Sequence, residues 1–434
     1  MALAARRLRA LAQQCRCSAV AAALPQPVPT GPAPAPHPPR RLRAADCRLE
    51  TLLACVEPVL LEDYPLASEV VEDVVIYDRD VLAAASGDGA LLPGSELVMA
   101  LEDELMAAFS DGPGIVVIRN AIGHDAIDRV SASFGALLEQ ERAAGTAAGD
   151  HFGEPGANSR LWNSLEKLAL ADPPGFARYF ANDVVPAVSR AWLGPAFQVT
   201  SQLNIVHPSG AAQTPHRDYH LGFMTAAQKE RYPAHVHRSS AMLTLQGAVA
   251  HCDMPVECGP TTYLPHSHKM EGGYLAYELA PFKEYYREHR VQLPLSKGDA
   301  AFFNPALFHA AGDNLSADID REANLLQISS SLGRAMETVD RQRMSLALYP
   351  TLRELSSAGE LTEPMVANVV AASAEGYPFP TNLDVDQPIG GLAPRSQSDV
   401  VTQALEEGWP LRRLEKELAD QQARRRPSQS RRRM

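Results

Sequence analysis

The sequence predicts an α+β fold in which helices come first and an all-β sandwich or barrel follows. Between residues 95 and 194, apolar residues recur at helical spacing. From about residue 196, short apolar runs alternate with Gly, Pro, Asp and Ser, which is typical of short strands joined by turns. After residue 335 the helical spacing returns, so further helices are expected behind the β-region.

The first half of the chain predicts three helices and one strand. The helices are expected over 95–112, 124–145 and 174–194, and the strand over 114–120. Gly112 and Gly145 stand where the first two helices should stop, because glycine tolerates the backbone conformation of a helix end. The run "GIVVIRN" is short and β-branched, which favours a strand.

The β-region contains six apolar runs that predict strands. They are "FQVTSQLNIV", "AMLTLQGAVA", "TTYLP", "VQLPL", "DAAFFNPALFHAAG" and "ANLLQISSSLG". Near the C-terminus, "DVVTQALEEGWPLRRLEKELADQQARRR" predicts a charged helix that is broken or kinked at Pro410. Five segments are expected. They are a disordered or targeting extension (1–45), an N-terminal extension (46–95), a core domain (96–335), a helical region (336–420) and a basic disordered tail (421–434).

The charge is unevenly distributed over the 434 residues. Residues 1–45 carry seven Arg and no acid, and residues 421–434 carry six Arg and no acid. Between them, 27 basic residues face 52 acidic ones. This acidic body argues against general nucleic-acid binding. The six cysteines are sparse for this length and do not suggest a disulfide framework, so free thiols in a reducing compartment are expected.

A cytoplasmic location follows from these observations, with one alternative. The Arg-rich, acid-free N-terminus suits a mitochondrial presequence, although a disordered extension explains the same composition. No apolar run approaches the roughly 20 residues that span a bilayer, so no membrane span is expected.

The segment "TPHRDYH" is the first candidate for chemistry. His216, Asp218 and His220 fall at alternate positions, and in an extended segment alternate side chains point to one face. A metal ion is the obvious occupant of such a face. We expect His216 and Asp218 to be ligands. His220 could be a third ligand on the same face, but a supporting place behind the other two is favoured.

A third ligand would complete a set of two histidines and one carboxylate, which is the signature of non-haem Fe(II) oxygenases. His251, the pair His266 and His268, and His309 are the candidates. His309 is the best placed, because "AAFFNPALFH" is an apolar segment that delivers a histidine at its end. His251 is better explained as a hydrogen-bonded histidine at the end of a strand.

Arg321 opens the run "REANLLQIS", twelve residues after His309. A hairpin-like return would bring its guanidinium near the metal, where it could pair with a carboxylate. 2-Oxoglutarate is an acid that chelates iron through one end and needs such a partner at the other. Asp313 and Asp320 flank the same loop and could instead hold Arg321 in a structural ion pair.

At this point the sequence resembles the phytanoyl-CoA dioxygenase family of Fe(II)/2-oxoglutarate-dependent oxygenases. The resemblance covers roughly residues 100–335 and rests on "TPHRDYH", "ECGPTTYLPHSHK", "KGDAAFFNPALFHAAGDNLS" and "REANLLQIS" in that order. It implies a double-stranded β-helix, a jelly-roll, cupin-like core with helices packed around it. It also implies that His216, Asp218 and His309 ligate iron and that Arg321 binds the far carboxylate of 2-oxoglutarate.

One position departs from the family pattern. The family often has a hydroxyl residue two positions after the distal histidine, where it helps to bind the co-substrate, and this sequence has Ala311. The missing contact could come from Thr261, Thr262 or Asn204. The iron ligands are not affected by this change.

The resemblance implies a dioxygenase that hydroxylates a small organic molecule or acyl conjugate while it decarboxylates 2-oxoglutarate to succinate. Its expected partners are the small-molecule substrate, 2-oxoglutarate and O2, with ascorbate as a stimulant. Because Asp218 is intact, hydroxylation is favoured over the halogenation seen in relatives that lack this acid. The alternatives are a non-redox jelly-roll metalloenzyme and a catalytically retired binding protein with the same fold, and 2-oxoglutarate decarboxylation separates them from a hydroxylase.

Overall fold

The computed structural model describes residues 41–146 and 157–427. The expectations for residues 1–40 and 428–434 therefore lie outside the described residues. The helices are α2 (Leu49–Leu53), α3 (Arg79–Ser86), α4 (Glu96–Ser110), α5 (His124–Ala143), α6 (Ser164–Ala171), α7 (Pro173–Phe180), α8 (Val184–Leu193), α9 (Ala226–Lys229), α10 (Ala234–Met242), α11 (Gly273–Ala276), α12 (Ala280–His289), α13 (Arg341–Ser357), α14 (Glu363–Ser373), α15 (Gln397–Glu406) and α16 (Leu411–Arg425). The strands are β1 (Glu69–Val71), β2 (Val74–Asp78), β3 (Ile115–Arg119), β4 (Asn158–Leu161), β5 (Gln198–Val206), β6 (Thr244–Ala250), β7 (Thr262–Leu264), β8 (Ala300–Phe303), β9 (Phe308–Ala310) and β10 (Arg321–Ser329).

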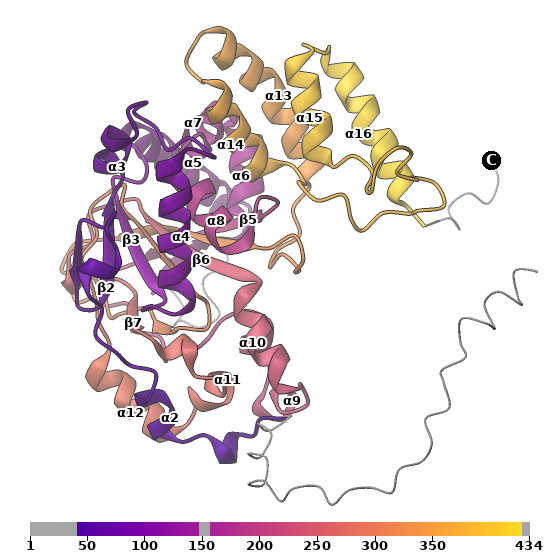
Figure 1. The fold of residues 1–434 in the computed structure, drawn as a ribbon. Coiled ribbons are helices and arrows are strands. Elements are labelled where there is room, and N and C mark those ends of the chain that lie inside the picture. The colour runs from indigo at the N-terminus through magenta and orange to yellow at the C-terminus, as the bar shows by residue number, and fades with distance from the viewer. Residues whose placement is uncertain (1–40, 147–156, 428–434) are drawn as a thin grey trace, which may run out of the picture. The chain divides into compact units, whose positions relative to one another are not determined.

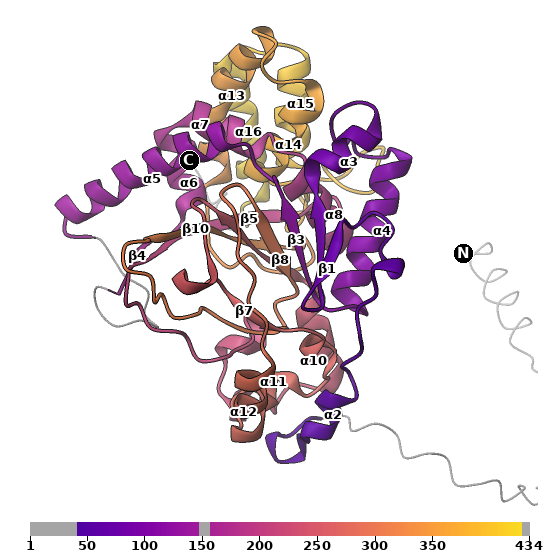
Figure 2. The same ribbon diagram turned by 90° about the vertical axis from the view of Figure 1, so that its left-hand side faces the viewer.

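Eight of these strands form one sheet in the order β1-β2-β3-β8-β6-β10-β5-β4. All neighbours are antiparallel except β2 and β3, which are parallel. Strands β7 and β9 form a second, two-stranded sheet. Figure 2 shows β7 lying apart from the strands of the large sheet. The fold is thus α+β with a jelly-roll core, as the sequence predicts.

The second layer is completed by isolated bridges rather than by long strands. His216 pairs with His309, Met254 with Leu295, and Tyr263 with Val291. The segment "VQLPL" was expected to be a strand, and the structure corrects this to two single bridges at its ends. Pro294 has no N–H to donate to a ladder, which explains why pairing does not continue through this segment.

The large sheet presents its two faces to different surroundings. Alternate residues such as Val116, Ile118, Leu326 and Ile328 belong to one hydrophobic core with the surrounding helices. The residues between them, such as Ile115 and Val117, turn to the opposite face and pack with Tyr263 of the small sheet. The period of two along each strand therefore separates a helix-covered face from a face that looks into the jelly roll.

The predicted helix over 174–194 is two helices. Helix α7 ends at Phe180 and α8 begins at Val184. The side-chain Oδ1 of Asn182 accepts a hydrogen bond from the N–H of Val185 at 2.8 Å, and Pro186 follows in the first turn of α8. A local cap and an early proline both favour a new helix start at this point.

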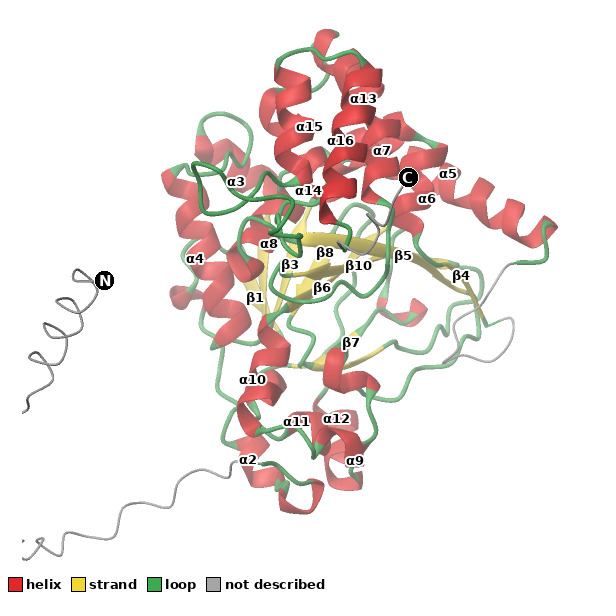
Figure 3. Cartoon of the chain, turned by 90° about the vertical axis from the view of Figure 1, so that its right-hand side faces the viewer, coloured by secondary structure: helices red, strands yellow, loops and turns green. Residues whose placement is uncertain are grey.

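Both ends of the described chain are built into the fold. Strand β2 pairs with β3, so the N-terminal extension contributes two strands to the large sheet. Helix α13 packs against α6 and α7, and Figure 1 and Figure 3 show α13, α15 and α16 together at one end of the molecule. The break at Pro410 is confirmed, because α15 ends at Glu406 and α16 begins at Leu411.

Helix α16 continues to Arg425, into the segment that was expected to be a disordered tail from residue 421. Gln421 is buried and its side chain donates to the carbonyl of Arg395 at 2.8 Å, which ties this part of the helix to the preceding loop. None of the described helices combines the length and the apolar character that a membrane crossing requires.

Candidate metal centre and active-site pocket

Three predicted side chains meet at one point of the jelly roll. Nε2 of His216 lies 3.6 Å from Oδ1 of Asp218, and Nε2 of His309 lies 3.4 Å from Oδ2 of the same carboxylate. One ligand atom from each of the three lies within 4.8 Å of the others, and no other such group of three occurs among the described residues. This cluster could hold a metal ion.

The backbone holds two distant segments together at this cluster. The N–H of His216 donates to the carbonyl of His309 at 3.0 Å, and the N–H of His309 donates back at 3.2 Å. The N–H of Asp218 donates to the carbonyl of Pro305 at 3.1 Å. The position of the two imidazoles is therefore fixed by main-chain pairing and does not depend on the side chains alone.

The outer nitrogen of each imidazole fixes its protonation. Nδ1 of His216 lies 2.8 Å from the carbonyl of Thr214, and Nδ1 of His309 lies 2.9 Å from the carbonyl of Leu307. A carbonyl oxygen only accepts hydrogen bonds, so each Nδ1 carries the proton in the neutral ring. The lone pair of each Nε2 is left on the side of Asp218, as metal binding requires.

The carboxylate of Asp218 is held in its charged form. Burial alone would raise the pKa of this carboxyl, but the neighbouring His216 and His309 outweigh it and keep the pKa well below its usual range. Nε2 of Gln246 also donates to Oδ2 of Asp218 at 2.6 Å. With a metal ion bound, the cluster would offer two neutral nitrogen donors and an anionic oxygen donor, the set that suits non-haem Fe(II).

His220 does not share the face of His216 and Asp218, contrary to the expectation from the alternating pattern. Tyr219 and His220 both have positive φ, at 62° and 41°, and the chain turns there instead of staying extended. The His220 ring lies against Ser240, with Nδ1 at 3.2 Å from Oγ, and burial lowers its pKa. His220 therefore belongs to the packing behind the loop.

The other histidines that were weighed as ligands have different surroundings. The two ring nitrogens of His251 lie 2.8 Å from Oγ of Ser131 and 3.0 Å from the hydroxyl of Tyr179. This confirms the hydrogen-bonded, strand-end role expected for His251. Nε2 of His268 lies 3.1 Å from the carbonyl of Ser110. Neither histidine joins the cluster around Asp218.

A cavity of about 410 Å³ opens beside the cluster, and Arg321, Asn204 and Thr261 all line it. Arg321 is the first residue of β10 and is buried. Its Nη1 has no hydrogen-bond partner within the described residues, and burial lowers its pKa. The carboxylates that could have paired with it bond elsewhere, because Asp313 accepts from the N–H of Ala212 and Asp320 pairs with His207.

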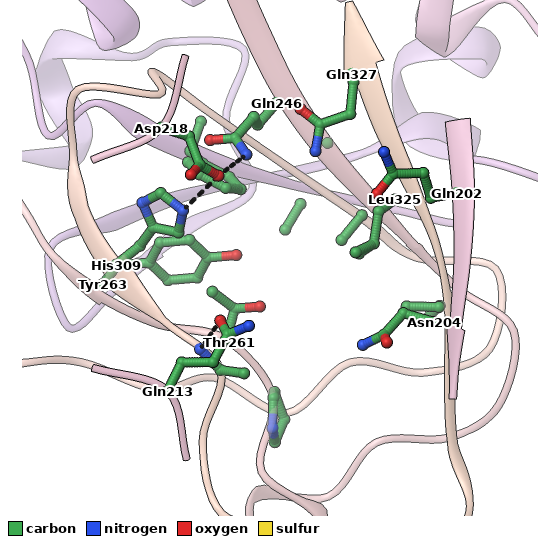
Figure 4. Close-up of a pocket in the computed structure, with 18 of the residues that line it drawn as sticks. Gln202, Asn204, Gln213, Asp218, Gln246, Thr261, Tyr263, His309, Leu325 and Gln327 are labelled. Carbon is green, nitrogen blue, oxygen red and sulfur yellow. Dashed lines mark hydrogen bonds and ion pairs between the residues drawn. The ribbon is translucent and has the colours of Figure 1, made fainter. Parts of the chain in front are cut away.

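Of the three candidates for the missing hydroxyl contact, two face the cavity and one does not. Thr262 points away from the cavity, where its hydroxyl lies 2.6 Å from that of Tyr286 and donates to the carbonyl of Ala310. Thr261 and Asn204 remain, and Figure 4 shows both facing the open space of the pocket. Tyr263, which sequence reasoning did not single out, faces the same space beside His309.

Sequence reasoning also missed three glutamines of the pocket, Gln202, Gln246 and Gln327. The alternation along their strands could have assigned each to one face. It could not have told which face carries the cavity, because that depends on how β5, β6 and β10 pair. Trp162 also lines the pocket and is half-buried.

Arg217 lies between the two predicted ligands of the loop and anchors it from behind. Its guanidinium is buried, donates to the carbonyls of Ser267 and Met270, and lies 5.0 Å from the ring centres of Tyr274 and Phe308. Burial lowers its pKa to about 10. Because neighbouring residues of an extended chain point to opposite sides, Arg217 points inward where His216 and Asp218 point to the cavity.

The anchor leads to a prediction at Gly273. A Cβ atom there would lie 1.9 Å from Cζ of Arg217, so Gly273→Ala must displace the guanidinium. We expect about 1–3 kcal/mol lower unfolding free energy and weaker metal binding, measured by chemical denaturation and Mn(II) titration. Gly135→Ala is the control, because nothing lies within 4 Å of its Cβ in α5 and the helix should gain about 0.5–1 kcal/mol. Unchanged stability and metal affinity in Gly273→Ala would contradict the anchoring role.

The comparison with protein families decides what this site belongs to. Residues 110–323, which contain all three cluster residues and Arg321, match the family model described as phytanoyl-CoA dioxygenase (PhyH). This region belongs to the phytanoyl-CoA dioxygenase family. The match makes the protein an enzyme of the dioxygenase class, and the cluster of His216, Asp218 and His309 could hold its metal ion.

Several solved structures resemble the phytanoyl-CoA dioxygenase domain at low sequence identity. EctD from S. alaskensis with bound Fe is 19% identical, with a TM-score of 0.41 over 57% of this chain and 80% of its own. The carbocyclase SnoK from nogalamycin biosynthesis is 19% identical, with a TM-score of 0.39 over 54% and 86%. HygX from Streptomyces hygroscopicus is 18% identical, with a TM-score of 0.36 over 55% and 90%. A comparison with the curated proteins finds no match.

The residues of the pocket fit the cofactor and co-substrate of the phytanoyl-CoA dioxygenase family. The cluster offers two imidazole nitrogens and a carboxylate, and a metal ion held by these three ligands would keep positions for a chelating acid. The same cavity contains a buried guanidinium nitrogen with no partner in the described chain, and a carboxylate is its natural complement.

Proposed function

We propose that the protein is an Fe(II)/2-oxoglutarate-dependent dioxygenase that hydroxylates a small organic molecule. In this proposal His216, Asp218 and His309 hold the iron, and Arg321 binds the far carboxylate of 2-oxoglutarate. The observation that carries it is the presence of a three-ligand cluster and an unpaired, buried guanidinium nitrogen in one cavity.

Asn204 and Thr261 are proposed to complete the co-substrate site. Asn204 is the partner of Ala323 across the β5–β10 pair, so its side chain lies on the same face as Arg321, one step along the strands. Asn204 and Thr261 both line the cavity, and Thr261 faces it from the loop before β7. A carboxylate would accept hydrogen bonds from the hydroxyl of Thr261 and from Nδ2 of Asn204, in place of a hydroxyl at Ala311.

When bound, Fe(II) supplies the redox chemistry that couples decarboxylation of 2-oxoglutarate to oxidation of a substrate C–H bond. The chain itself does the positioning. The carbonyls of Thr214 and Leu307 keep the two imidazoles in the metal-binding tautomer. Gln246 fixes the carboxylate of Asp218, and the inward Arg217 keeps the loop in place. The apolar walls of the sheet and Tyr263 limit water in the cavity.

The alternatives from the sequence differ from this proposal in one measurable respect. A non-redox metalloenzyme or a retired binding protein consumes no 2-oxoglutarate. A buried arginine whose only complement in the cavity would be an external acid argues against both. Asp218 supports hydroxylation over halogenation, since its carboxylate takes the ligand position that a halide would need.

The test is succinate formation from 2-oxoglutarate by the full-length protein with Fe(II), ascorbate and O2, with and without a chelator. We expect chelator-sensitive succinate, a faster rate with substrate, and a product that gains one oxygen atom from ¹⁸O₂. The protein could bind iron stoichiometrically and still form no succinate in the presence of a ligand that the pocket binds. That result would favour the non-redox metalloenzyme. If succinate forms together with a desaturated, cyclised or epimerised product, the protein is still a 2-oxoglutarate-dependent enzyme, but the proposed hydroxylation is wrong.

A further inference from the structure

Three buried carboxamides line the pocket next to the metal cluster. Gln202, Gln246 and Gln327 come from the adjacent strands β5, β6 and β10, and Gln246 is the direct cross-strand partner of Gln327. Their exposed fractions are 1%, 5% and 6%. Figure 4 shows them together on one side of the open space, with Gln246 beside Asp218.

The oxygens of two of these carboxamides have nothing to bond to. Because the carboxylate of Asp218 only accepts, the amide of Gln246 must present Nε2 to it, which leaves Oε1 for another group. Oε1 of Gln246 and Oε1 of Gln327 both lack a hydrogen-bond partner in the part of the chain that the structure describes.

Most buried polar groups in proteins are hydrogen-bonded, and the exceptions call for an explanation. Leu325, Ala248 and Phe303 on this face of the sheet offer no donor. Thr200, Thr244 and Ser329 share the face, but neither Oε1 accepts a hydrogen bond from them. Both glutamines line the cavity, so a ligand there can donate to Oε1 of Gln246 and to Oε1 of Gln327. A ligand that displaces water from the cavity has to replace the hydrogen bonds of that water.

We infer that the primary substrate is a neutral compound rich in hydroxyl groups, of the sugar or cyclitol class, and that Gln202, Gln246 and Gln327 bind its hydroxyls. This inference rests on the proposed function and specifies its substrate. A hydroxyl both donates and accepts, so it matches a carboxamide in either orientation. An aliphatic acyl chain would leave Oε1 of Gln246 and Oε1 of Gln327 buried without partners, and sites built for hydroxyls reject such analogues by about 10,000-fold or more.

The contact between Gln246 and Asp218 indicates how the substrate is oriented relative to the metal cluster. Gln246 touches a proposed metal ligand through its nitrogen and would accept from a substrate hydroxyl through its oxygen. A hydroxyl bound there lies next to the metal cluster. The carbon that carries it, or the adjacent carbon, is then presented for oxidation, and Gln246 acts as a positioning residue for both substrate and ligand.

The test measures binding without turnover. The full-length protein, loaded with Mn(II) and 2-oxoglutarate under nitrogen, is titrated by calorimetry with methyl glucoside, myo-inositol, octanoate and octanoyl-CoA. We expect a hydroxyl-rich probe to bind more tightly than either aliphatic probe. Gln327→Leu and Gln202→Leu should weaken that binding by about ten-fold or more, whereas Gln403→Leu on α15, outside the pocket, should leave it unchanged.

Three results would overturn the inference: tighter binding of octanoate or octanoyl-CoA, no binding of any hydroxyl-rich probe, or binding that Gln327→Leu and Gln202→Leu leave unchanged. Mn(II) and 2-oxoglutarate affinity serves as the folding control, because these variants should retain it. If the unmodified protein does not bind 2-oxoglutarate, that result counts against the proposed function and not against the substrate inference. Failure of one can therefore be told from failure of the other.

Discussion

Asp218→Ala is expected to abolish 2-oxoglutarate turnover and to weaken divalent metal binding by more than about 100-fold. Asp218 supplies the only anionic donor of the cluster, and two neutral imidazoles alone bind Fe(II) poorly. The substitution also leaves Nε2 of Gln246 without its acceptor. Metal affinity is measured by Mn(II) titration, and turnover is measured as succinate.

The control for Asp218 is Asn, which has nearly the same shape and keeps an oxygen that can accept from Gln246. Asp218→Asn should fold as the unmodified protein does and still lose most of its metal affinity, because the charge is what it lacks. Succinate production at the unmodified rate by Asp218→Ala would remove Asp218 from the proposed ligand set.

Arg321→Met is expected to raise the KM for 2-oxoglutarate by about 100-fold or more, since losing one partner of a buried, hydrogen-bonded charge pair costs about 2–5 kcal/mol. The same change should not destabilise the protein without ligands. The guanidinium of Arg321 is buried there with an unpaired nitrogen, and methionine replaces most of its stem. The two measurements are the KM for 2-oxoglutarate and the melting temperature of the ligand-free protein.

Arg341→Met is the matched control for Arg321. Arg341 is also buried, but its two terminal nitrogens donate to the carbonyls of Ala372 and Val199. Replacing it should lower the melting temperature and leave the KM unchanged, the opposite pattern. If Arg321→Met lowered the melting temperature as much as Arg341→Met does and left the KM alone, Arg321 would be a structural residue.

Much of the site could be predicted from local patterns. "TPHRDYH", the histidine at the end of "AAFFNPALFH" and the arginine that opens "REANLLQIS" appear in the order that the family shares, and the structure brings all of them to one cavity. The β-region could be recognised because its runs alternate in hydrophobicity over short lengths. These features depend on residues close in sequence.

What could not be predicted depends on pairing between distant segments or on unusual backbone angles. The approach of Gln246 to Asp218 follows from the register of β6 in the sheet and from a loop held by Pro305. The turn at Tyr219 and His220 needs positive φ in residues that rarely adopt it, so an alternating pattern suggested the wrong place for His220.

The N-terminal strands were missed for a related reason. Strand β2 is only five residues long, Val74–Asp78, and nothing near it in sequence shows that it will pair with β3. The "VQLPL" run had the composition of a strand, yet a single proline limited it to bridges.

The most direct test of the iron and co-substrate site is an anaerobic titration of Fe(II)-loaded protein with 2-oxoglutarate, followed by the visible charge-transfer absorption that appears when a 2-oxo acid chelates Fe(II). The account predicts a saturable band in the unmodified protein, a band that needs about 100-fold more 2-oxoglutarate in Arg321→Met, and no band in Asp218→Ala. A protein that binds Fe(II) but develops no band, or a band unaltered by both substitutions, would contradict it.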